Sequence, residues 1–389
     1  MLYIHIPFCH HKCTYCAFYS RACHGVEEAY VEALCKELAM RVNELHQQDC
    51  YNDTLYLGGG TPSLLSIGQL KTIKNTIIQH VNIDKMQEST LECNPEDLTP
   101  EYLAGLQKLQ LFNRLSMGIQ SFRNDDLRLL NRAHNTQQAL EAVVQAQQAG
   151  FHNISVDLIY GLPNQTLQDW KDNLAIAESL NIQHLSCYAL TVEQGTMLEK
   201  QIAMGRTRPA DETVVLAQYN YLLEWVSQHG FIQYEISNFC RPGFRAIHNS
   251  RYWQRLPYIG IGAAAHSFHD NIRRWNVADV KQYSQGVMKA SVLAANNKAE
   301  TGSNENKTVT YFSKEQLSDK DAYNETIMLG LRTTDGIDKS TLPYHWLNTL
   351  ENSAQRFVEE RLLLVTPTHI LPTRQGLLQA DGIAAELFI

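Results

Sequence analysis

Residues 1–18 read MLYIHIPFCHHKCTYCAF, a short apolar run followed by three closely spaced cysteines, Cys9, Cys13 and Cys16. In a chain of 389 residues with no secretion signal, cysteines this crowded indicate metal ligation rather than disulfides. The apolar run, residues 2–6, is a strand candidate and is far too short to cross a membrane. The stretch therefore predicts a strand that leads into a metal-binding loop.

Beyond this stretch, short β-rich runs alternate with longer amphipathic patterns as far as residue 189. The predicted strands are 2–6, 54–57, 89–93, 114–117, 154–159 and 184–189. The predicted helices are 27–45, 67–80, 100–109, 136–149 and 166–180. Strands that alternate with helices form a parallel sheet through right-handed crossovers. We therefore expect an α/β fold, a partial (β/α)6 TIM-like barrel, with a doubly wound open sheet as the alternative.

The rhythm of the sequence changes after residue 190, which divides the chain into four predicted parts. Residues 1–190 form the barrel core, and 191–293 complete the barrel. Residues 294–317 are polar and rich in helix breakers, which predicts an exposed loop. Residues 318–389 carry helical patterns and a final pair of short strands, which predict a small C-terminal α/β domain.

Composition and charge narrow the class of protein. A net charge of -8 argues against a nucleic-acid binder that works through a broad basic surface. No uncharged run is long enough for a membrane helix, so we expect the protein in the cytoplasm, with membrane association only peripherally through partners. The remaining six cysteines are expected to be small hydrophobic residues in the interior: Cys23, Cys35, Cys50, Cys93, Cys187 and Cys240.

The cysteine spacing C-x3-C-x2-C suits an iron–sulfur cluster with one open iron. Cubane clusters usually take four thiolates, so three ligands leave one iron free to bind S-adenosylmethionine (SAM). Reduction of such a cluster cleaves the sulfonium of SAM, which is cofactor chemistry that the protein positions. The alternatives at this point are a zinc site, which usually needs a second cysteine pair, and a chance cluster of cysteines.

Other chemically distinctive residues follow the predicted strands, where a barrel places its functional groups. The glycine run 58–60 follows the second strand and lacks the pattern of a phosphate-binding loop, so it suits close approach of the backbone to a small ligand. Glu92 ends the third strand, Gln120 follows the fourth, and Asp157 lies near the end of the fifth.

With these motifs in place, the sequence resembles the HemN-like branch of the radical SAM superfamily. The resemblance is carried by residues 3–18, LGGGTPS (57–63), LECNPE (91–96), SMGIQSF (116–122) and DLIYGLP (157–163). It implies a [4Fe-4S] cluster on the three cysteines and a C-terminal domain of the HemN type. It also implies SAM contacts by Tyr3, Gly59, Gly60, Thr61 and Glu92, and residues around a second SAM position at Gln120, Arg132 and Asp157.

One departure from the oxidase of this branch bears on function. Coproporphyrinogen dehydrogenase carries a fourth cysteine two residues after the third, and this chain has Phe18 there. Residues 248–253, HNSRYW, instead resemble the H-N-x-x-Y-W signature of haem chaperones in the branch. An imidazole is a common haem ligand, and Tyr252 and Trp253 offer flat faces to a porphyrin.

The resemblance implies that His248 binds haem as cargo. The alternative is structural, with His248 hydrogen-bonded in a loop and the two aromatic residues anchoring the second domain. His266, which lies in a run of small residues, is expected to be buried rather than to act as a ligand.

The leading hypothesis is a haem chaperone that delivers haem to apo-haemoproteins, expected to be respiratory. Its expected partners also include an electron donor for the cluster and, in a homodimer, a second copy of the chain. The alternative hypothesis is a radical SAM enzyme. It would be an oxygen-independent coproporphyrinogen III oxidase, a HemN-like methyltransferase or a haem-degrading enzyme.

Overall fold

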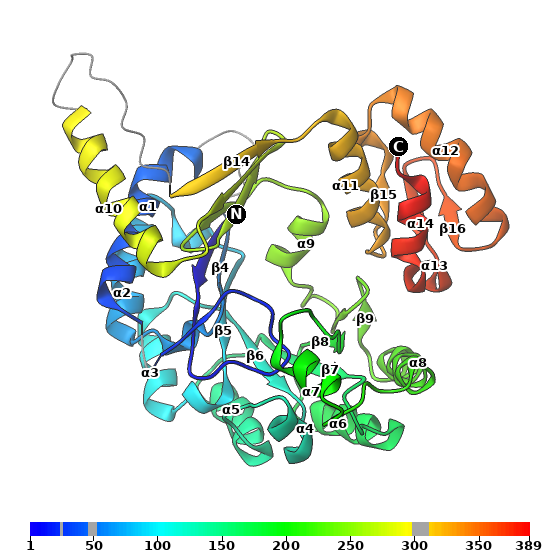
Figure 1. Ribbon diagram of the computed structural model, residues 1–389, viewed down its shortest axis with the longest axis horizontal. Coiled ribbons are helices and arrows are strands. Elements are labelled where there is room, and N and C mark those ends of the chain that lie inside the picture. Colours follow the sequence, from blue (N-terminus) through cyan, green and yellow to red (C-terminus); the bar gives the residue numbers. More distant parts are fainter. Residues whose placement is uncertain (24–25, 46–52, 298–310) are drawn as a thin grey trace.

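Six parallel strands from the first half of the chain form the centre of a nine-stranded sheet (Figure 1). The computed structural model describes residues 1–23, 26–45, 53–297 and 311–389. The six strands are β1 (Leu2–Ile6), β4 (Thr54–Gly59), β5 (Glu88–Cys93), β6 (Arg114–Gln120), β7 (Ile154–Tyr160) and β8 (His184–Ala189). All six predicted strands are present, within three residues at each end.

The order of strands distinguishes a barrel from a doubly wound sheet. From β1 to β8 the parallel strands are neighbours in the order of the sequence, without the reversal that a doubly wound sheet shows. β11 (Ile259–Ile261) adds to β1 in parallel, and β10 (Asn238–Cys240) and β9 (Ile232–Gln233) add antiparallel beyond β8. The predicted partial barrel of six βα units is confirmed.

Helices follow the strands and cover the outer face of the curved sheet (Figure 1). They are α1 (Glu28–Leu45), α2 (Ile67–Ile78), α3 (Pro100–Leu109), α4 (Asn124–Leu129), α5 (Thr136–Gln148) and α6 (Leu167–Ser179). α2, α5 and α6 each begin at a reciprocal capping box, on Ser66, Asn135 and Thr166. Each of these boxes satisfies two backbone donors, which explains why the helices start where the amphipathic pattern predicts.

The segment after β8 adds strands to both edges of the sheet and further helices around it. It contains α7 (Met197–Ala203), α8 (Glu212–Gln228), α9 (Ile247–Trp253) and α10 (Val280–Asn297). A second, antiparallel sheet consists of β12 (His266–His269), β13 (Ile272–Asn276) and β14 (Phe312–Gln316). Residues 298–310 of the predicted loop lie outside the described residues. At its two ends, residues 294–297 belong to α10 and 312–316 to β14.

The C-terminal domain has a hydrophobic core of its own, centred on residues such as Ile327, Leu350 and Ile370. It comprises α11 (Asp319–Leu331), β15 (Ile337–Asp338), α12 (Tyr344–Glu359), β16 (Leu363–Val365), β17 (His369–Pro372), α13 (Arg374–Leu378) and α14 (Ala380–Leu387). In the described part of the chain, no helix has the length and apolarity needed to span a membrane.

Candidate functional site

The cysteine loop is fixed to the barrel by backbone hydrogen bonds. Its first cysteine ends the short strand β2 (Phe8–Cys9), which pairs in parallel with β3 (Arg21–Ala22). The amide of Cys23 donates to the carbonyl of Cys9 at 2.9 Å, and the amide of Thr14 donates to the carbonyl of Leu130 at 3.1 Å. The thiols of Cys9, Cys13 and Cys16 are each partly exposed in this loop.

A cavity of about 240 Å³ lies at the carboxyl ends of the strands, against the cysteine loop. It brings together nearly all of the site residues predicted from the sequence. Those that line it are Cys9, Cys13, Cys16, Gly59, Gly60, Thr61, Glu92, Gln120, Arg132 and Asp157. Sequence reasoning did not assign a role to Asn94, Glu96 and Ser116, which also line it, although all three lie in the motif stretches.

The glycine run packs its backbone directly against the first strand. A Cβ atom at Gly59 would lie 2.5 Å from the ring of His5, and one at Gly60 would lie 2.6 Å from the carbonyl oxygen of Phe8. Gly59 also has a φ of 116°, which side chains rarely adopt. Any other residue would therefore push the second strand away from the cysteine loop.

Glu92 occupies the floor between the glycine run and the next strands. Its carboxylate accepts hydrogen bonds from the hydroxyl of Tyr56 at 2.7 Å and the amide of Gly59 at 2.9 Å. Burial raises the pKa of Glu92 to about 7, against the opposing effect of these two donors. Each carboxylate oxygen retains a second lone pair for a ligand hydroxyl.

Arg132, Gln120 and Asp157 line the same cavity. The Arg132 guanidinium donates to the sulfur of Cys13 at 3.3 Å and to the carbonyl of Gly118 at 2.6 Å. Gln120 follows a break in the register of β6 and has a φ of 71°, a backbone conformation that concentrates at functional sites. Burial raises the pKa of Asp157 to about 6.

The three thiols fit a cubane cluster, in which each cysteine binds a different iron atom. Cys93 also lines the cavity, but its thiol is buried and donates to the carbonyl of Leu91. Within the described ranges, no three His, Cys, Asp or Glu side chains are grouped as ligands of a single metal ion. Of the other scattered cysteines, Cys187 and Cys240 are buried, Cys23 and Cys35 are partly exposed, and Cys50 lies outside the described residues.

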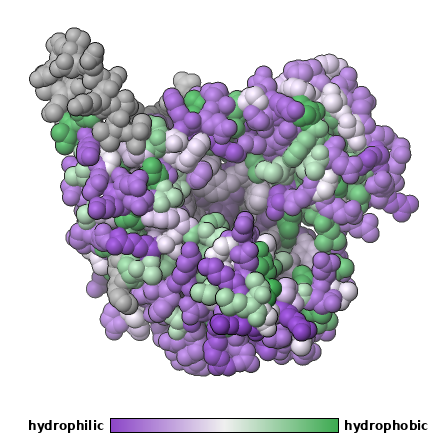
Figure 2. All heavy atoms as spheres, viewed as in Figure 1, coloured by the Kyte–Doolittle hydropathy of each residue, from purple (hydrophilic) through white to green (hydrophobic). Residues whose placement is uncertain are grey.

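A larger cavity of about 740 Å³ opens beside the first, and Figure 2 shows a hollow near the centre of the same face. Its walls come from the cysteine loop, the end of α9, the sheet of β12 and β13, and α11. Tyr3 lines this cavity rather than the smaller one, whereas Gly59, Glu92 and Phe18 line both. Phe18 is 76% exposed at the position where the oxidase has its fourth cysteine.

His248 lies outside both cavities and is fully buried, with 0% of its surface exposed. Its Nδ1 is 2.9 Å from the hydroxyl of Thr54, and its Nε2 is 2.9 Å from the hydroxyl of Tyr252. Burial lowers the pKa of its imidazole to about 3. Both ring nitrogens are therefore engaged, and ligation of iron through either nitrogen would require the hydrogen bond on that nitrogen to break.

The rest of the HNSRYW segment fastens α9 to the barrel. Glu88 of β5 accepts the amides of Ile247 and His248 at 2.8 and 3.0 Å, and Arg251 forms an ion pair with Asp53. Tyr252 reaches the larger cavity. The guanidinium of Arg332, at the end of α11, lies over the ring of Trp253. These contacts agree with the structural alternative for this motif, except that His248 lies in helix α9 and not in a loop.

His266 is exposed, so the expectation that it is buried was wrong. It begins strand β12 and lines the larger cavity. The small residues before it do not pack around its ring but form a tight turn, in which Gly262 and Ala264 have φ values of 111° and 62°.

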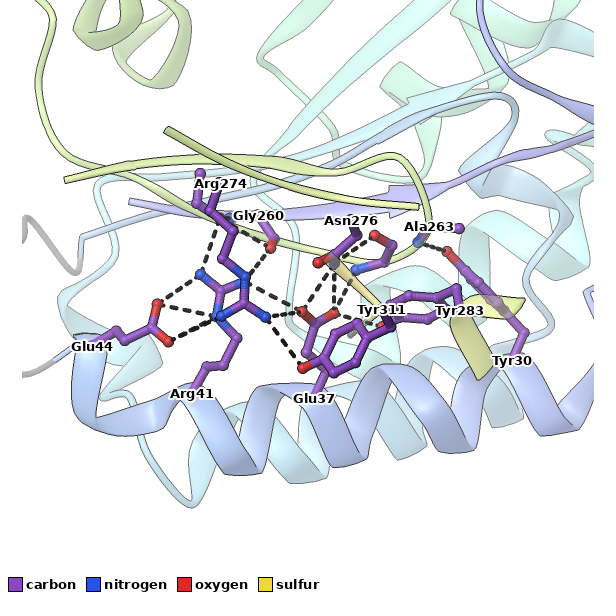
Figure 3. Close-up of polar contacts among 12 residues, drawn as sticks. Tyr30, Glu37, Arg41, Glu44, Gly260, Ala263, Arg274, Asn276, Tyr283 and Tyr311 are labelled. Atoms are coloured by element: carbon purple, nitrogen blue, oxygen red, sulfur yellow. Dashed lines mark hydrogen bonds and ion pairs between the residues drawn. The ribbon is translucent and has the colours of Figure 1, made fainter. Parts of the chain in front are cut away.

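A buried polar cluster around Glu37 of α1 supports that turn (Figure 3). The Glu37 carboxylate accepts the amide of Gly262 at 3.0 Å, the side-chain amide of Asn276 at 2.9 Å and the hydroxyl of Tyr283 at 2.6 Å. Arg41 lies beside it and donates to the carbonyl of Gly260 at 2.7 Å. The cluster joins α1 and α10 to the wall of the larger cavity.

Comparison with known proteins agrees with this arrangement. The model of the radical SAM superfamily matches residues 3–176, and that of the HemN C-terminal domain matches residues 317–378. The solved structure of the coproporphyrinogen III oxidase HemN from Escherichia coli superposes with a TM-score of 0.80 at 22% identity. That alignment covers 100% of this chain and 89% of HemN, and it shows a shared fold. The barrel and the cysteine loop thus define a radical SAM protein.

Relatives with higher sequence identity than HemN identify the family within this superfamily. The heme chaperone HemW of Bacillus subtilis is 33% identical over 98% of this chain and 97% of its own length. HemW of Lactococcus lactis is 34% identical over 86% and 82%, and HemW of Mycobacterium tuberculosis is 31% identical over 99% and 94%. The chain belongs to the HemW family of haem chaperones.

Proposed function

We propose that this protein binds haem and transfers it to apo-haemoproteins. The single structural observation that carries the proposal is the larger cavity, whose volume falls within the range of about 300–1,000 Å³ typical of small-molecule sites. Aromatic and aliphatic side chains line it, among them Tyr258, Phe268 and Leu256. Histidine and arginine side chains lie among them, so the cavity combines apolar walls with groups suited to an iron and to carboxylates.

Membership of the radical SAM superfamily implies a [4Fe-4S] cluster and SAM. We propose that Cys9, Cys13 and Cys16 hold the cluster. The proposed SAM-binding residues are Tyr3, Gly59, Gly60, Thr61, Glu92, Gln120, Arg132 and Asp157. In support, all but Tyr3 line one cavity with the three thiols, and Tyr3 lines the adjoining one. When bound, the cluster and SAM supply one-electron chemistry, while the chain orients them and limits the access of water.

We propose that the haem site lies directly beside the SAM site. Glu92 and Gly59 form part of both cavities, so occupancy of one site changes the surroundings of the other. We propose that the cluster and SAM regulate haem binding or release. We further propose that an electron donor reduces the cluster, that the recipient is a respiratory protein and that the chain forms a homodimer. Contact with the membrane is made through the recipient.

Coproporphyrinogen oxidation is less well supported. Phe18 stands at the position of the fourth cysteine of the oxidase motif, and the relatives from Lactococcus lactis, Bacillus subtilis and Mycobacterium tuberculosis that align over 86–99% of the chain are named heme chaperones. The likeness to HemN at 22% identity concerns the fold alone.

Haem titration tests the proposed function. The anaerobically reconstituted full chain is expected to bind ferric haem saturably at about one equivalent, since the larger cavity has the volume of a single small-molecule site. Difference absorbance in the Soret region gives the stoichiometry. A matched titration with bovine serum albumin as acceptor then tests whether the haem can be passed on. A linear, unsaturable absorbance change would reject the chaperone function and make coproporphyrinogen turnover the next assay.

SAM affinity is expected to rise with pH. A carboxylate accepts hydrogen bonds from ribose hydroxyls better than a carboxylic acid, and the raised pKa of Glu92 lies near 7. Between pH 6 and 8 the ionised fraction of such a group rises from about 10% to about 90%, so affinity should tighten by up to about ninefold. Calorimetry with Glu92→Gln should give weaker binding and a flatter pH profile.

The control for that measurement is Glu96→Gln. Glu96 lines the same cavity, and despite burial its pKa is lowered by the hydrogen bond to His134, so it is ionised throughout this range. This variant should retain the pH dependence of the wild type. A pH profile unchanged by Glu92→Gln would show that Glu92 does not contact the nucleoside.

A further inference from the structure

We propose that His266 is the axial ligand of the haem iron in the larger cavity, and that Arg273 and Arg255 bind a propionate. The inference rests on the proposed function and assigns the residues of its binding site. It also changes the role of the HNSRYW segment. His248 then positions side chains that line the cavity and does not bind the iron.

His266 meets the requirements of an iron ligand better than His248. Its imidazole lines the cavity and is exposed there. Nowhere in the described parts of the chain does a group hydrogen-bond to its ring, which stacks against Trp275 with 6.2 Å between ring centroids. Burial and the nearby Arg273 both lower the pKa of His266, which favours the neutral imidazole that binds metals.

A second imidazole supports the assignment of the site. The ring of His5 also lines the cavity, and its Nε2 is buried without a hydrogen-bond partner. Its Nδ1 is 2.8 Å from the hydroxyl of Tyr3. Burial, and after it the positive charge of a protonated His266, lower the pKa of His5 to about 4. A buried and unpaired polar nitrogen in such a cavity points to a ligand that the site is built to receive.

The turn before His266 fixes the position of its ring. Ala264 holds a left-handed φ of 62°, and its amide donates to the carbonyl of Val277 at 3.0 Å. The Glu37 cluster binds Gly262 of the same turn, and the hydroxyl of Tyr30 accepts the amide of Ala263 (Figure 3). A ligand residue held this firmly needs little reorganisation to bind its metal.

Two arginine side chains that line the cavity suit an anionic edge of the porphyrin. Arg255 and Arg273 both pair with Glu325 of α11, so two guanidinium groups share one carboxylate. The Arg255 guanidinium also lies over the ring of Phe268 at 4.6 Å. This arrangement leaves an excess positive charge beside an aromatic wall, and arginine binds carboxylates in a planar, two-pronged geometry.

His248 acts in this account as a positioning residue. Its Nε2 contacts the hydroxyl of Tyr252, and Tyr252 packs edge-on against Tyr258 with 4.7 Å between ring centroids. Both tyrosines line the cavity. Loss of the His248 side chain would therefore disturb the aromatic wall without removing an iron ligand.

Three histidine variants of the full reconstituted chain test the assignment with ferric haem. His266→Ala is expected to weaken haem binding by about tenfold or more and to shift the Soret band, because a haem that loses its axial imidazole changes its coordination. Added imidazole should restore the wild-type spectrum. His269→Ala is the matched control, since His269 lies on the same strand but not in the cavity, and it should behave as the wild type.

His248→Ala separates the two histidines. It is expected to weaken binding while its bound haem keeps the Soret position of the wild type, with no response to imidazole. The inference is overturned if His266→Ala matches the wild type in affinity and spectrum, or if imidazole rescues His248→Ala instead. In either case the wild type still binds haem, which leaves the proposed function intact. Failure of the wild type to bind would reject both.

Haem dimethyl ester tests the propionate contact. The ester lacks both carboxylates, so the wild type should bind it more weakly than haem by about tenfold, as expected for loss of a charge-assisted pair. In Arg273→Gln this difference should shrink. Equal affinities of the wild type for haem and its ester would remove the arginines from the site.

Discussion

Replacing Glu37 by alanine is expected to lower the free energy of unfolding by about 3–5 kcal/mol, the usual cost of removing one partner from a buried ionic cluster. The carboxylate is fully buried and receives hydrogen bonds from α10, from β13 and from the turn before His266. Its loss leaves Arg41 without one of its acidic partners and the Gly262 amide without an acceptor. Chemical denaturation of the full chain measures the effect.

Glu44→Ala is the matched control for this prediction. Glu44 lies two turns further along α1 and also pairs with Arg41, but its side chain is 39% exposed. An exposed partner of this kind contributes up to about 1 kcal/mol. A similar loss of stability in the two variants would show that the buried position of Glu37 has no special importance. Haem binding should fall only in Glu37→Ala, because Glu37, and not Glu44, accepts a hydrogen bond from the turn.

The barrel could be predicted from the sequence because each of its strands and helices is encoded by a short continuous stretch of residues. Each strand is a short apolar run, and each helix carries its own amphipathic period and, in several cases, its own capping box. The carboxyl ends of neighbouring parallel strands meet at one edge, so the placement of Cys9, Glu92 and Asp157 in the chain was enough to predict that they lie together.

The larger cavity could not be predicted in this way. Its walls combine residues far apart in the chain, from the cysteine loop to α11, and no local period encodes their meeting. His248 and His266 show the consequence. A histidine in a polar segment proved to be buried against Thr54, and a histidine after a run of alanines proved to be exposed. In both cases distant partners decided the burial, which a single sequence does not reveal.

The two cavities suggest how cofactor and cargo are related. Phe18, Gly59 and Glu92 line both, so the replacement of the fourth cysteine lies on the boundary between the proposed SAM and haem sites. An exposed aromatic ring there gives the haem site an apolar surface and adds no thiol. The residue that replaces the fourth cysteine of the oxidase motif therefore forms part of the apolar surface of the larger cavity.

Cys13→Ala is expected to abolish assembly of the cluster, the largest effect predicted for the cofactor site. With only two thiolates in the loop, the reconstituted chain should hold well under one iron atom in place of about four. Iron and sulfide analysis, together with the visible absorption of the cluster, measures this loss. The neighbouring thiols provide matched controls, because the amide of Cys23 donates to the carbonyl of Cys9 and Cys93 lines the same cavity.

Cys23→Ala and Cys93→Ala should retain the full iron content if three cysteines hold the cluster and one iron stays open to SAM. Loss of iron in either control would identify a fourth protein ligand. That result would close the iron to which SAM binds and contradict the proposed cofactor site, whatever the outcome of the haem titration. Retention of iron in Cys13→Ala would likewise show that Cys13 is not a ligand of the cluster. The hydrogen bond from Arg132 to the Cys13 sulfur would then have no role in binding the cluster.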